Sequence, residues 1–448
     1  MKKSSVRFVC RSCGAASSTW SGRCYNCGEW NTLEEEIQAG AVNLKQQGQQ
    51  LKVAKVSQVA SKQQGGRLPT GLNDIDIVLG GGFVKGSVSL MAGEPGIGKS
   101  TLLLQIAQAL ATNHAVLYVS GEESAHQLGL RAARLGANST KLMASASNSA
   151  DDIAATIASG DYQLAIVDSI QTITCAAVSS APGSVSQITN STHLLSTAAK
   201  QSNTALIMVG HVTKEGSIAG PKVLEHLVDV VLQLEGDRYG GFKVLRGVKN
   251  RYGSTNEVAI LEMQDIGLMS VKNPSAALLA ERQISDGSVV LATMEGSRPI
   301  LVEVQALVNK TAYGYPKRTA SGIDLNRVNL LIAMLERRTK LNLSDQDIYI
   351  NIVGGIRITE PAADLAVCLA IGSAAKGLML KQNAVVFGEV GLSGEVRHVP
   401  FIEKRVEEAR KLGFDAAIGP KVKVGKSPKL LTGVSTVREA LNQFLEKD

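Results

Sequence analysis

The stretch Gly93-Glu94-Pro95-Gly96-Ile97-Gly98-Lys99-Ser100 decides the fold, because it fits the pattern G-x-x-x-x-G-K-S of a phosphate-binding loop. The apolar run 87–92 before it predicts a buried strand, and the segment 101–110 after it predicts a helix. A strand before and a helix after are the context that the pattern requires, since the glycine-rich turn and the helix N-terminus aim backbone N–H groups at a phosphate. We therefore expect this loop and Thr101 to bind ATP, with Lys99 on the β- and γ-phosphates and the Ser100 hydroxyl on Mg²⁺.

Short apolar runs recur after this loop, at 116–119, 164–167, 206–209 and 228–234. Helix-like segments separate them, and buried strands joined by helices are typical of a parallel sheet. We therefore interpret residues 67–272 as one α/β domain. Residues 285–448 open with strand-like segments and continue with helices and strands, which predicts a further domain of the α+β class.

Acidic residues follow two of these runs and are candidates for the chemistry of ATP hydrolysis. Asp168 directly follows four apolar residues, so a buried strand carries its carboxylate to the sheet edge where the phosphate loop lies. There it is placed to bind Mg²⁺ together with Ser100. Glu122 and Glu123 follow another strand and reach the same edge, where either carboxylate is suited to activating water. An acid pair that only complements the N-terminus of a helix is the alternative.

His211 follows the run 206–209 and is expected at the same edge of the sheet. It is placed to sense the γ-phosphate and to pass that signal to the loop 213–222. This loop holds Lys214 and Gly216 and has the composition of a mobile loop that contacts a polyanion. A histidine that only satisfies a structural hydrogen bond is the alternative.

Four of the six cysteines lie near the start of the chain, in the arrangement Cys10-x₂-Cys13-x₁₀-Cys24-x₂-Cys27. Two such C-x-x-C pairs supply the four thiolates of a tetrahedral structural zinc site. A unit of this size buries too little apolar surface to fold alone, so the metal supplies the folding free energy. We therefore predict a zinc ribbon over 1–30; an iron–sulfur cluster or a redox dithiol is the alternative.

Trp20 and Trp30 fall in the same unit as these cysteines. They either stack on nucleic acid bases, or pack the ribbon and dock a partner protein. Residues 31–66 are polar and rich in glutamine, which predicts a linker.

The composition excludes several classes of protein. Of the 448 residues, 44% are hydrophobic and 19% are charged, which is ordinary for globular chains and excludes wholesale disorder. No apolar run approaches the roughly 20 residues that span a bilayer, and no apolar segment follows the basic start of the chain. We expect a cytoplasmic protein with no membrane partner, in which Cys175 and Cys368 are buried thiols. The net charge of +7 suits a polyanionic partner such as nucleic acid.

The motifs taken together resemble a known family. Three successive segments are similar to the RecA-like ATPases: Thr70-Gly71-Leu72-Asn73-Asp74-Ile75-Asp76, Leu79-Gly80-Gly81-Gly82 and the phosphate loop. Two further features narrow the resemblance to the bacterial RadA/Sms family of recombination and repair ATPases. They are the cysteine unit before these segments and the stretch Lys249-Asn250-Arg251-Tyr252-Gly253 after them. The signature of this family usually has phenylalanine where this chain has Tyr252. The resemblance covers essentially the whole chain.

This resemblance implies a homo-hexameric ring that hydrolyses ATP, moves along single-stranded DNA and extends branch migration of branched recombination intermediates beside the RecA protein. In such rings each nucleotide lies between two subunits, and a cation from the neighbouring subunit stabilises the transition state. Lys249 and Arg251 are the candidates for this cation, and Arg251 is preferred. A basic turn on the protein surface is the alternative.

Residues 285–448 resemble the proteolytic domain of the Lon proteases. The stretch Thr359-Glu360-Pro361-Ala362-Ala363-Asp364-Leu365 matches the turn that carries the nucleophilic serine, and alanine, assigned to Ala363, stands at the serine position. The lysine base falls near Glu403, with Lys404 one residue away. Because no acyl-enzyme forms without a hydroxyl, we expect a proteolytically inactive scaffold that assembles the ring. The basic residues of this domain offer either a DNA contact or a solvated surface: Lys310, Lys317, Arg318 and Arg327.

The sequence thus predicts an ATP-driven DNA motor. The alternative is a nucleotide-switched regulatory protein that binds partners without moving on DNA. The pair Lys249 and Arg251 disfavours this alternative, because a simple switch needs no cation from a second subunit. Ala363 argues against an ATP-dependent protease.

Overall fold

The computed structural model describes residues 6–13, 15–37, 66–211, 223–236, 241–312, 314–381, 383–422 and 428–446. Contacts along the chain divide it into two compact units, 1–65 and 66–448. Most of the predicted linker 31–66 lies outside the described residues. The predicted loop 213–222, with Lys214 and Gly216, lies outside them entirely.

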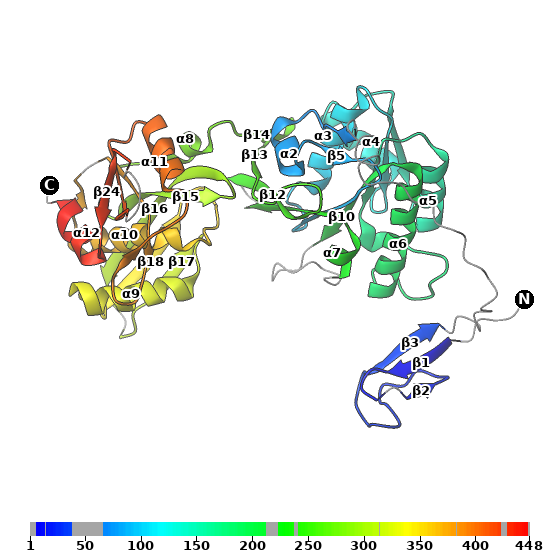
Figure 1. Ribbon diagram of the computed structural model, residues 1–448, viewed down its shortest axis with the longest axis horizontal. Helices are drawn as coiled ribbons and strands as arrows, with labels where there is room; N and C mark the ends of the chain where they lie inside the picture. Colours follow the sequence, from blue (N-terminus) through cyan, green and yellow to red (C-terminus); the bar gives the residue numbers. More distant parts are fainter. Residues whose placement is uncertain are drawn as a thin grey trace, which may run out of the picture. The chain divides into compact units, whose positions relative to one another are not determined.

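The N-terminal unit is a small three-stranded antiparallel sheet with the strand order β2-β1-β3 (Figure 1). Its strands are β1 (Val6–Cys10), β2 (Ala16–Ser17) and β3 (Leu33–Ile37). The buried core consists of Cys10, Cys24 and Leu33, with Phe8 and Ala15 packed against them. So few apolar side chains do not offset the conformational entropy that folding costs, and this unit therefore depends on a further cross-link among its cysteines.

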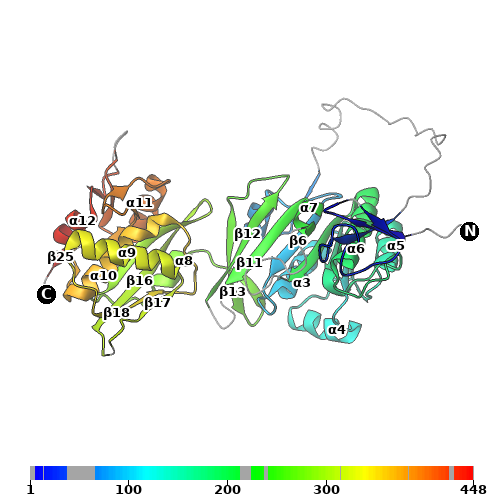
Figure 2. The same ribbon diagram turned by 90° about the horizontal axis from the view of Figure 1, so that it is seen from below.

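A nine-stranded sheet with the order β14-β13-β12-β11-β6-β10-β9-β7-β8 forms the first part of the larger unit. Its strands are β6 (Val88–Gly93), β7 (Val116–Ser120), β8 (Leu142–Ala146), β9 (Leu164–Asp168), β10 (Ala205–His211), β11 (Val230–Gly236), β12 (Phe242–Asn250), β13 (Val258–Gln264) and β14 (Gly267–Ser270). The six strands from β11 to β8 are parallel, which confirms the predicted parallel sheet. Strands β12, β13 and β14 continue it, each antiparallel to the strand before it; Figure 2 shows β12 and β13 beside β11.

Both faces of the inner parallel strands β6, β7, β9 and β10 are buried, which explains why their sequences are mostly apolar. The edge strand β8 is largely exposed. On β10, Leu206 and Met208 join one hydrophobic cluster, while Ile207 and Val209 join another. The first cluster includes residues of α5 (Ala150–Ser159), α6 (Val185–Ser202) and α7 (Val223–Leu227). The second includes residues of α2 (Asn73–Leu79), α3 (Lys99–Ala111) and α4 (Ala125–Arg134). Two helical layers therefore enclose the sheet, as Figure 1 shows.

The second part of the larger unit is built on a mixed seven-stranded sheet with the order β17-β18-β16-β15-β20-β23-β24. Its strands are β15 (Ser288–Glu295), β16 (Arg298–Lys310), β17 (Arg318–Ser321), β18 (Gln346–Ile352), β20 (Ala384–Val386), β23 (Ala416–Pro420) and β24 (Leu431–Val434). Its helices are α8 (Pro274–Leu279), α9 (Leu325–Thr339), α10 (Asp364–Lys376), α11 (Ile402–Lys411) and α12 (Val437–Phe444). Leu278 of α8 belongs to the hydrophobic cluster of this sheet, so the segment before residue 285 already packs with the C-terminal region.

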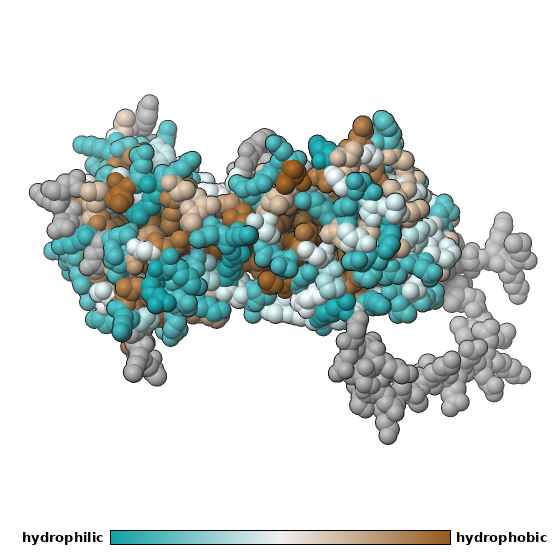
Figure 3. Space-filling view, turned by 90° about the horizontal axis from the view of Figure 1, so that it is seen from above, coloured by the Kyte–Doolittle hydropathy of each residue, from teal (hydrophilic) through white to brown (hydrophobic). Residues whose placement is uncertain are grey.

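On the face shown in Figure 3, hydrophilic residues alternate with apolar patches. None of the helices in the described part of the chain has the length and apolar character needed to cross a membrane. Cys175 and Cys368 are both buried and unpaired, as expected for small apolar side chains.

An ion pair of a buried arginine joins α11 to β15 and to the segment before α10. Arg405 is only 1% exposed, and its Nη2 and Nη1 donate to the two carboxylate oxygens of Glu360 at 2.7 and 2.9 Å. Nη1 also donates to the Ala292 carbonyl at 2.5 Å. Glu360 accepts two further hydrogen bonds, from the Thr293 hydroxyl at 2.6 Å and the Met294 N–H at 2.8 Å. The buried guanidinium and the partly buried carboxylate are therefore paired, which is the condition under which a buried charge is tolerated.

Replacing Arg405 by alanine is expected to lower the free energy of unfolding of the C-terminal region by about 3 kcal/mol, because the partly buried carboxylate of Glu360 would lose its partner and the buried Arg405 side chain would leave a cavity. Urea-induced unfolding followed by circular dichroism measures the change. Arg397→Ala is the matched control, since Arg397 pairs with Glu395 at the exposed surface and its loss should change stability far less. Equal effects of the two substitutions would contradict the structural role of Arg405.

Candidate ATP site and metal site

The predicted ATP-site residues meet at the carboxyl edge of the parallel strands. Gly93 at the end of β6 and His211 at the end of β10 are register partners. Asp168 at the end of β9 is the register partner of Ser120, the last residue of β7. Because β6, β10, β9 and β7 are consecutive in the sheet, the residues that follow them share one edge. Glu122 lies two residues beyond β7 and belongs to this group.

The phosphate loop joins β6 to α3, and Lys99 is the first residue of that helix. The Lys99 side chain is 4% exposed, and its Nζ donates to the carbonyls of Gly93 and Glu94, both at 2.9 Å. Burial lowers the pKa of Lys99, and nearby carboxylates, foremost that of Asp168, oppose this shift. Gly98 has a φ of +114°, a backbone conformation that residues with a Cβ rarely adopt, so the turn requires glycine.

Asp168 ends β9 at this edge of the sheet, and it is 6% exposed. Its Oδ2 accepts a hydrogen bond from the Tyr118 hydroxyl at 2.7 Å. Among the described residues, no hydrogen bond is made to its Oδ1. Ser100 offers a hydroxyl from the first turn of α3. A carboxylate and a hydroxyl oxygen are the ligands that Mg²⁺ prefers, so this donor set fits the metal.

Glu122 faces the site, and Glu123 is held elsewhere. Oε1 of Glu122 accepts a hydrogen bond from the Ser169 hydroxyl and lies 3.2 Å from Nε2 of His211. Partial burial favours the neutral carboxyl, but the hydrogen bonds from Ser169 and His211 outweigh it and lower the pKa of Glu122. Glu123 instead forms an ion pair with Arg131 at 2.5 Å. Of the two acids that the sequence left open, Glu122 has the better position to activate water.

Lys249 and Arg251 lie at the opposite edge of the sheet. Nζ of Lys249 donates to the carbonyls of Glu225 and Val228, at 2.5 and 2.8 Å. Nη1 of Arg251 lies 3.2 Å from Oδ1 of Asp229, whose Oδ2 accepts from the backbone N–H of Val88 at 3.0 Å.

The basic pair is separated from the phosphate loop of its own chain by the length of a strand. Val88 begins β6 and Gly93 ends it. At about 3.3 Å per residue, the strand carries the chain about 16 Å between the two edges. Asn250, Tyr252 and Gly253 complete the signature at the same edge, where the Tyr252 carbonyl accepts from Nη2 of Arg67 at 2.5 Å.

The four cysteines of the N-terminal unit gather as the sequence predicts, and their ligand atoms all lie within 4.8 Å of one another. The Sγ atoms of Cys10 and Cys27 are 3.6 Å apart, and those of Cys13 and Cys24 are 3.7 Å apart. Four sulfurs at the Zn–S distance of about 2.3 Å in a tetrahedron lie about 3.8 Å from one another, so the cluster fits a structural zinc ion. Oγ1 of Thr32, 3.2 Å from the Cys10 sulfur, supports the ligand from outside the cluster.

Comparisons with known proteins identify the parts of the chain. Family models match residues 8–35 as a rubredoxin metal binding domain, 66–217 as an AAA domain and 323–423 as subunit ChlI of Mg-chelatase. The DNA repair protein RadA of Listeria monocytogenes is 46% identical over 99% of both chains. Those of Bacillus subtilis and Pseudomonas aeruginosa are 46% and 44% identical over 99% and 100% of this chain, and each is covered over its full length. The chain belongs to the RadA family of DNA repair proteins.

Membership of the RadA family confirms the resemblance that the motifs indicated. The chain is accordingly a DNA repair protein with an ATP-binding domain and a metal-binding ribbon. The C-terminal match is consistent with the expected Lon-like architecture.

The positions that match the Lon active site hold no nucleophile in this RadA family member. Ala362 and Ala363 are both buried in a short 3₁₀ helix (Pro361–Ala363) before α10, so a shift of one residue in the alignment changes nothing. Nζ of Lys404 donates to the Ser297 carbonyl at 3.2 Å, and Glu403 is exposed.

Of the basic residues considered for DNA, Arg327 is engaged within the C-terminal region. Nε of Arg327 donates to Oδ1 of Asp364 at 2.9 Å, and a second hydrogen bond joins its Nη2 to Oδ2. Asp364 is almost completely buried. This pair therefore makes Arg327 a poor candidate for a DNA contact, which leaves Lys310, Lys317 and Arg318 as the remaining candidates.

Sequence reasoning missed two hydroxyl groups of the ATP site, those of Tyr118 and Ser169. Ser169 directly follows Asp168, and that position is a signal that could have drawn attention to it. Tyr118 is a buried aromatic residue in a strand, and nothing in the sequence distinguishes it from an ordinary core residue.

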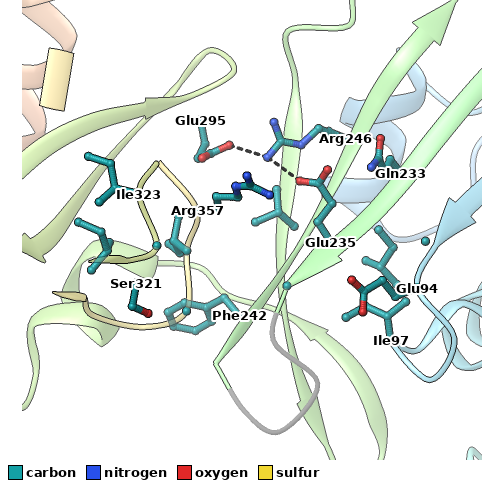
Figure 4. A pocket seen from close by; sticks show the side chains of 18 residues that line it. Glu94, Ile97, Gln233, Glu235, Phe242, Arg246, Glu295, Ser321, Ile323 and Arg357 are labelled. Atoms are coloured by element: carbon teal, nitrogen blue, oxygen red, sulfur yellow. Dashed lines mark hydrogen bonds and ion pairs between the residues drawn. The ribbon is translucent and has the colours of Figure 1, made fainter. Parts of the chain in front are cut away.

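Sequence reasoning also missed a cavity of about 740 Å³ beside the phosphate loop, lined by Glu94 and Ile97 and by residues of the C-terminal region (Figure 4). Nη2 of Arg246 lies 3.2 Å from Oε2 of Glu235 and 3.0 Å from Oε2 of Glu295. Burial raises the pKa of Glu295, and the charge of Arg246 opposes this shift. Glu235 lies on β11, directly after the register partner of Gly93, so β11 runs beside the phosphate loop. Through Arg246, the two ion pairs connect β11 with the end of β15.

Cys24→Ser is expected to release the metal from the ribbon, because three thiolates leave the tetrahedral shell open. Elemental analysis of the purified full-length protein should fall from one zinc per chain to well below one. Cys175→Ser is the control, since Cys175 lies outside the cluster. Retention of stoichiometric zinc by Cys24→Ser would contradict the four-cysteine site.

Proposed function

We propose that this protein is a DNA-dependent ATPase of recombinational repair. Its subunits form a homo-hexameric ring, with one ATP between each pair of neighbours, and the ring moves along single-stranded DNA. It promotes branch migration of branched recombination intermediates together with RecA, a partner proposed from family resemblance. Such a protein acts where the chromosomal DNA is, in the cytoplasm.

One observation carries the proposal: the two halves of the predicted catalytic machinery lie at opposite edges of the same sheet. Lys99, Glu122 and Asp168 lie at the carboxyl edge, and the pair Lys249 and Arg251 lies at the other. A rigid sheet cannot bring these edges together within one chain. If the basic pair takes part in hydrolysis, a second subunit has to present it, and hydrolysis is then coupled to contact between subunits.

Each residue at the carboxyl edge has a role in this proposal. Lys99 exchanges the two carbonyls that it now contacts for the β- and γ-phosphates, and the backbone N–H groups from Gly96 to Thr101 surround the phosphates. Ser100 and Asp168 would hold Mg²⁺, which supplies charge neutralisation on the phosphates.

Glu122 is the general base of the proposed reaction. Its Oε1 is occupied by donors, so Oε2 receives the proton of the attacking water. The lowered pKa keeps Glu122 ionised at neutral pH. His211 contacts Glu122 directly and precedes the segment 213–222 predicted to be a loop, so it is placed to report the state of the γ-phosphate.

The remaining parts of the chain are proposed to support this motor. The ribbon binds zinc as a structural ion, in keeping with its sulfur–sulfur distances. The Lon-like region is proteolytically inactive and assembles the ring, since alanine stands where a nucleophile would be needed.

Lys99→Ala and Glu122→Gln should each lower the steady-state ATPase rate by at least about a hundredfold, because they remove a phosphate contact and the general base. Glu123→Gln is the matched control and should retain most of the activity, since its partner is Arg131. The assay is run with and without single-stranded DNA, which should accelerate the wild type. ATPase activity indifferent to DNA of every length would favour the nucleotide-switched regulator instead.

Mixing two inactive variants tests the cation supplied by the neighbour. Arg251→Ala should lower the rate about 10³-fold or more, and Lys99→Ala should be inactive. In a mixed ring, some sites combine an intact phosphate loop with an intact Arg251 from the adjacent subunit, so the mixture should regain measurable activity. A mixture as inactive as its components, in rings shown to contain both variants, would contradict the assignment of Arg251.

A further inference from the structure

A tyrosine hydroxyl contacts the carboxylate that is proposed to bind Mg²⁺. Tyr118 lies on β7 and is 1% exposed, so its ring is immobilised by the core between the sheet and its helices. Its hydroxyl donates to Oδ2 of Asp168 at 2.7 Å. A hydrogen bond from a neutral hydroxyl to a buried carboxylate is charge-assisted and directional. It fixes the rotation of the carboxylate and leaves Oδ1 as the oxygen with no donor among the described residues.

A serine hydroxyl makes the corresponding contact with the proposed general base. Ser169 is completely buried, and its hydroxyl donates to Oε1 of Glu122. His211 approaches the same oxygen at 3.2 Å. Oε2 is therefore the oxygen of Glu122 that is left to receive a proton.

We infer that Tyr118 and Ser169 are positioning residues of the ATPase site: each holds one oxygen of one catalytic carboxylate and leaves the other oxygen to the reaction. The inference deepens the proposed function and rests on it. Neither residue touches nucleotide in this account. Tyr118 acts through Asp168 on metal binding, and Ser169 acts through Glu122 on the hydrolytic step.

The two hydroxyls are therefore expected to control different measurable quantities. An Asp168 carboxylate without its donor is free to rotate, so its affinity for the metal falls, whereas contacts between phosphates and the loop are unchanged. A Glu122 carboxylate without Ser169 loses its orientation towards water, so turnover falls while metal and nucleotide still bind. Removal of an outer-shell partner of this kind typically costs about 10- to 100-fold in metal affinity or activity.

The test measures binding of a fluorescent ADP analogue to the full-length protein, with Mg²⁺ and with EDTA, alongside steady-state ATPase kinetics. Tyr118→Phe should weaken the Mg²⁺-dependent affinity about tenfold and leave the affinity in EDTA unchanged. Ser169→Ala should lower kcat about tenfold or more and leave both affinities unchanged. Thermal unfolding of the nucleotide-free variants shows whether either substitution merely destabilises the domain.

Matched controls remove equivalent hydroxyls elsewhere in the same region. Tyr162→Phe removes a tyrosine hydroxyl that has no hydrogen-bond partner among the described residues. Ser139→Ala removes a serine hydroxyl that donates to the Ala111 carbonyl at 2.7 Å, away from the carboxyl edge. Both controls should bind nucleotide and turn over like the wild type.

Two results would overturn the inference. One is a Tyr118→Phe protein whose affinity falls equally with Mg²⁺ and with EDTA, or not at all. The other is a Ser169→Ala protein with wild-type kcat. Failure of the proposed function is distinguishable from both, because the wild type itself would then show no Mg²⁺-dependent nucleotide binding or no hydrolysis.

Discussion

The parallel register of β6, β10, β9 and β7 is the constraint on which the ATP site depends. These strands bring Gly93, His211, Asp168 and Ser120 to one edge although they lie far apart in the sequence. The strands hold their positions because both of their faces are covered by helices and buried. A site built on such strands is rigid, and only the side chains and the loops after the strands remain free to respond to a ligand.

The same rigidity gives the sheet two chemically different edges. The carboxyl edge carries the phosphate loop and the acidic residues, whereas the opposite edge carries the signature Lys249 to Gly253, held by Asp229 and Arg67. A site that needs both edges is complete only where two subunits meet. An assembly of this kind makes hydrolysis depend on the neighbour, which is the physical requirement for turnover to be coordinated around a ring.

In the C-terminal region, ion pairs stabilise the fold beside the positions that match the Lon active site, where a protease would need reactive side chains. Arg405 with Glu360 and Arg327 with Asp364 bury charge that is paired on both sides. Towards the phosphate loop, Arg246 contacts Glu235 and Glu295, so this region has a direct electrostatic connection with the strand next to the loop. The ion pair between Arg246 and Glu295 holds the C-terminal region to the ATPase sheet.

The sequence by itself determined the features that depend on local order along the chain. The phosphate loop is a continuous stretch, the zinc cluster is defined by the spacing of two cysteine pairs, and the apolar runs reveal parallel strands because burial of both faces leaves no polar position. The tertiary structure alone decided the features that depend on the rotation of side chains across strands. It directed Glu122 into the site and Glu123 towards Arg131, and it placed Tyr118 against Asp168 and Arg405 against Glu360. Such contacts join residues whose separation in sequence carries no periodic signal, so only the folded register of neighbouring strands and helices brings them together.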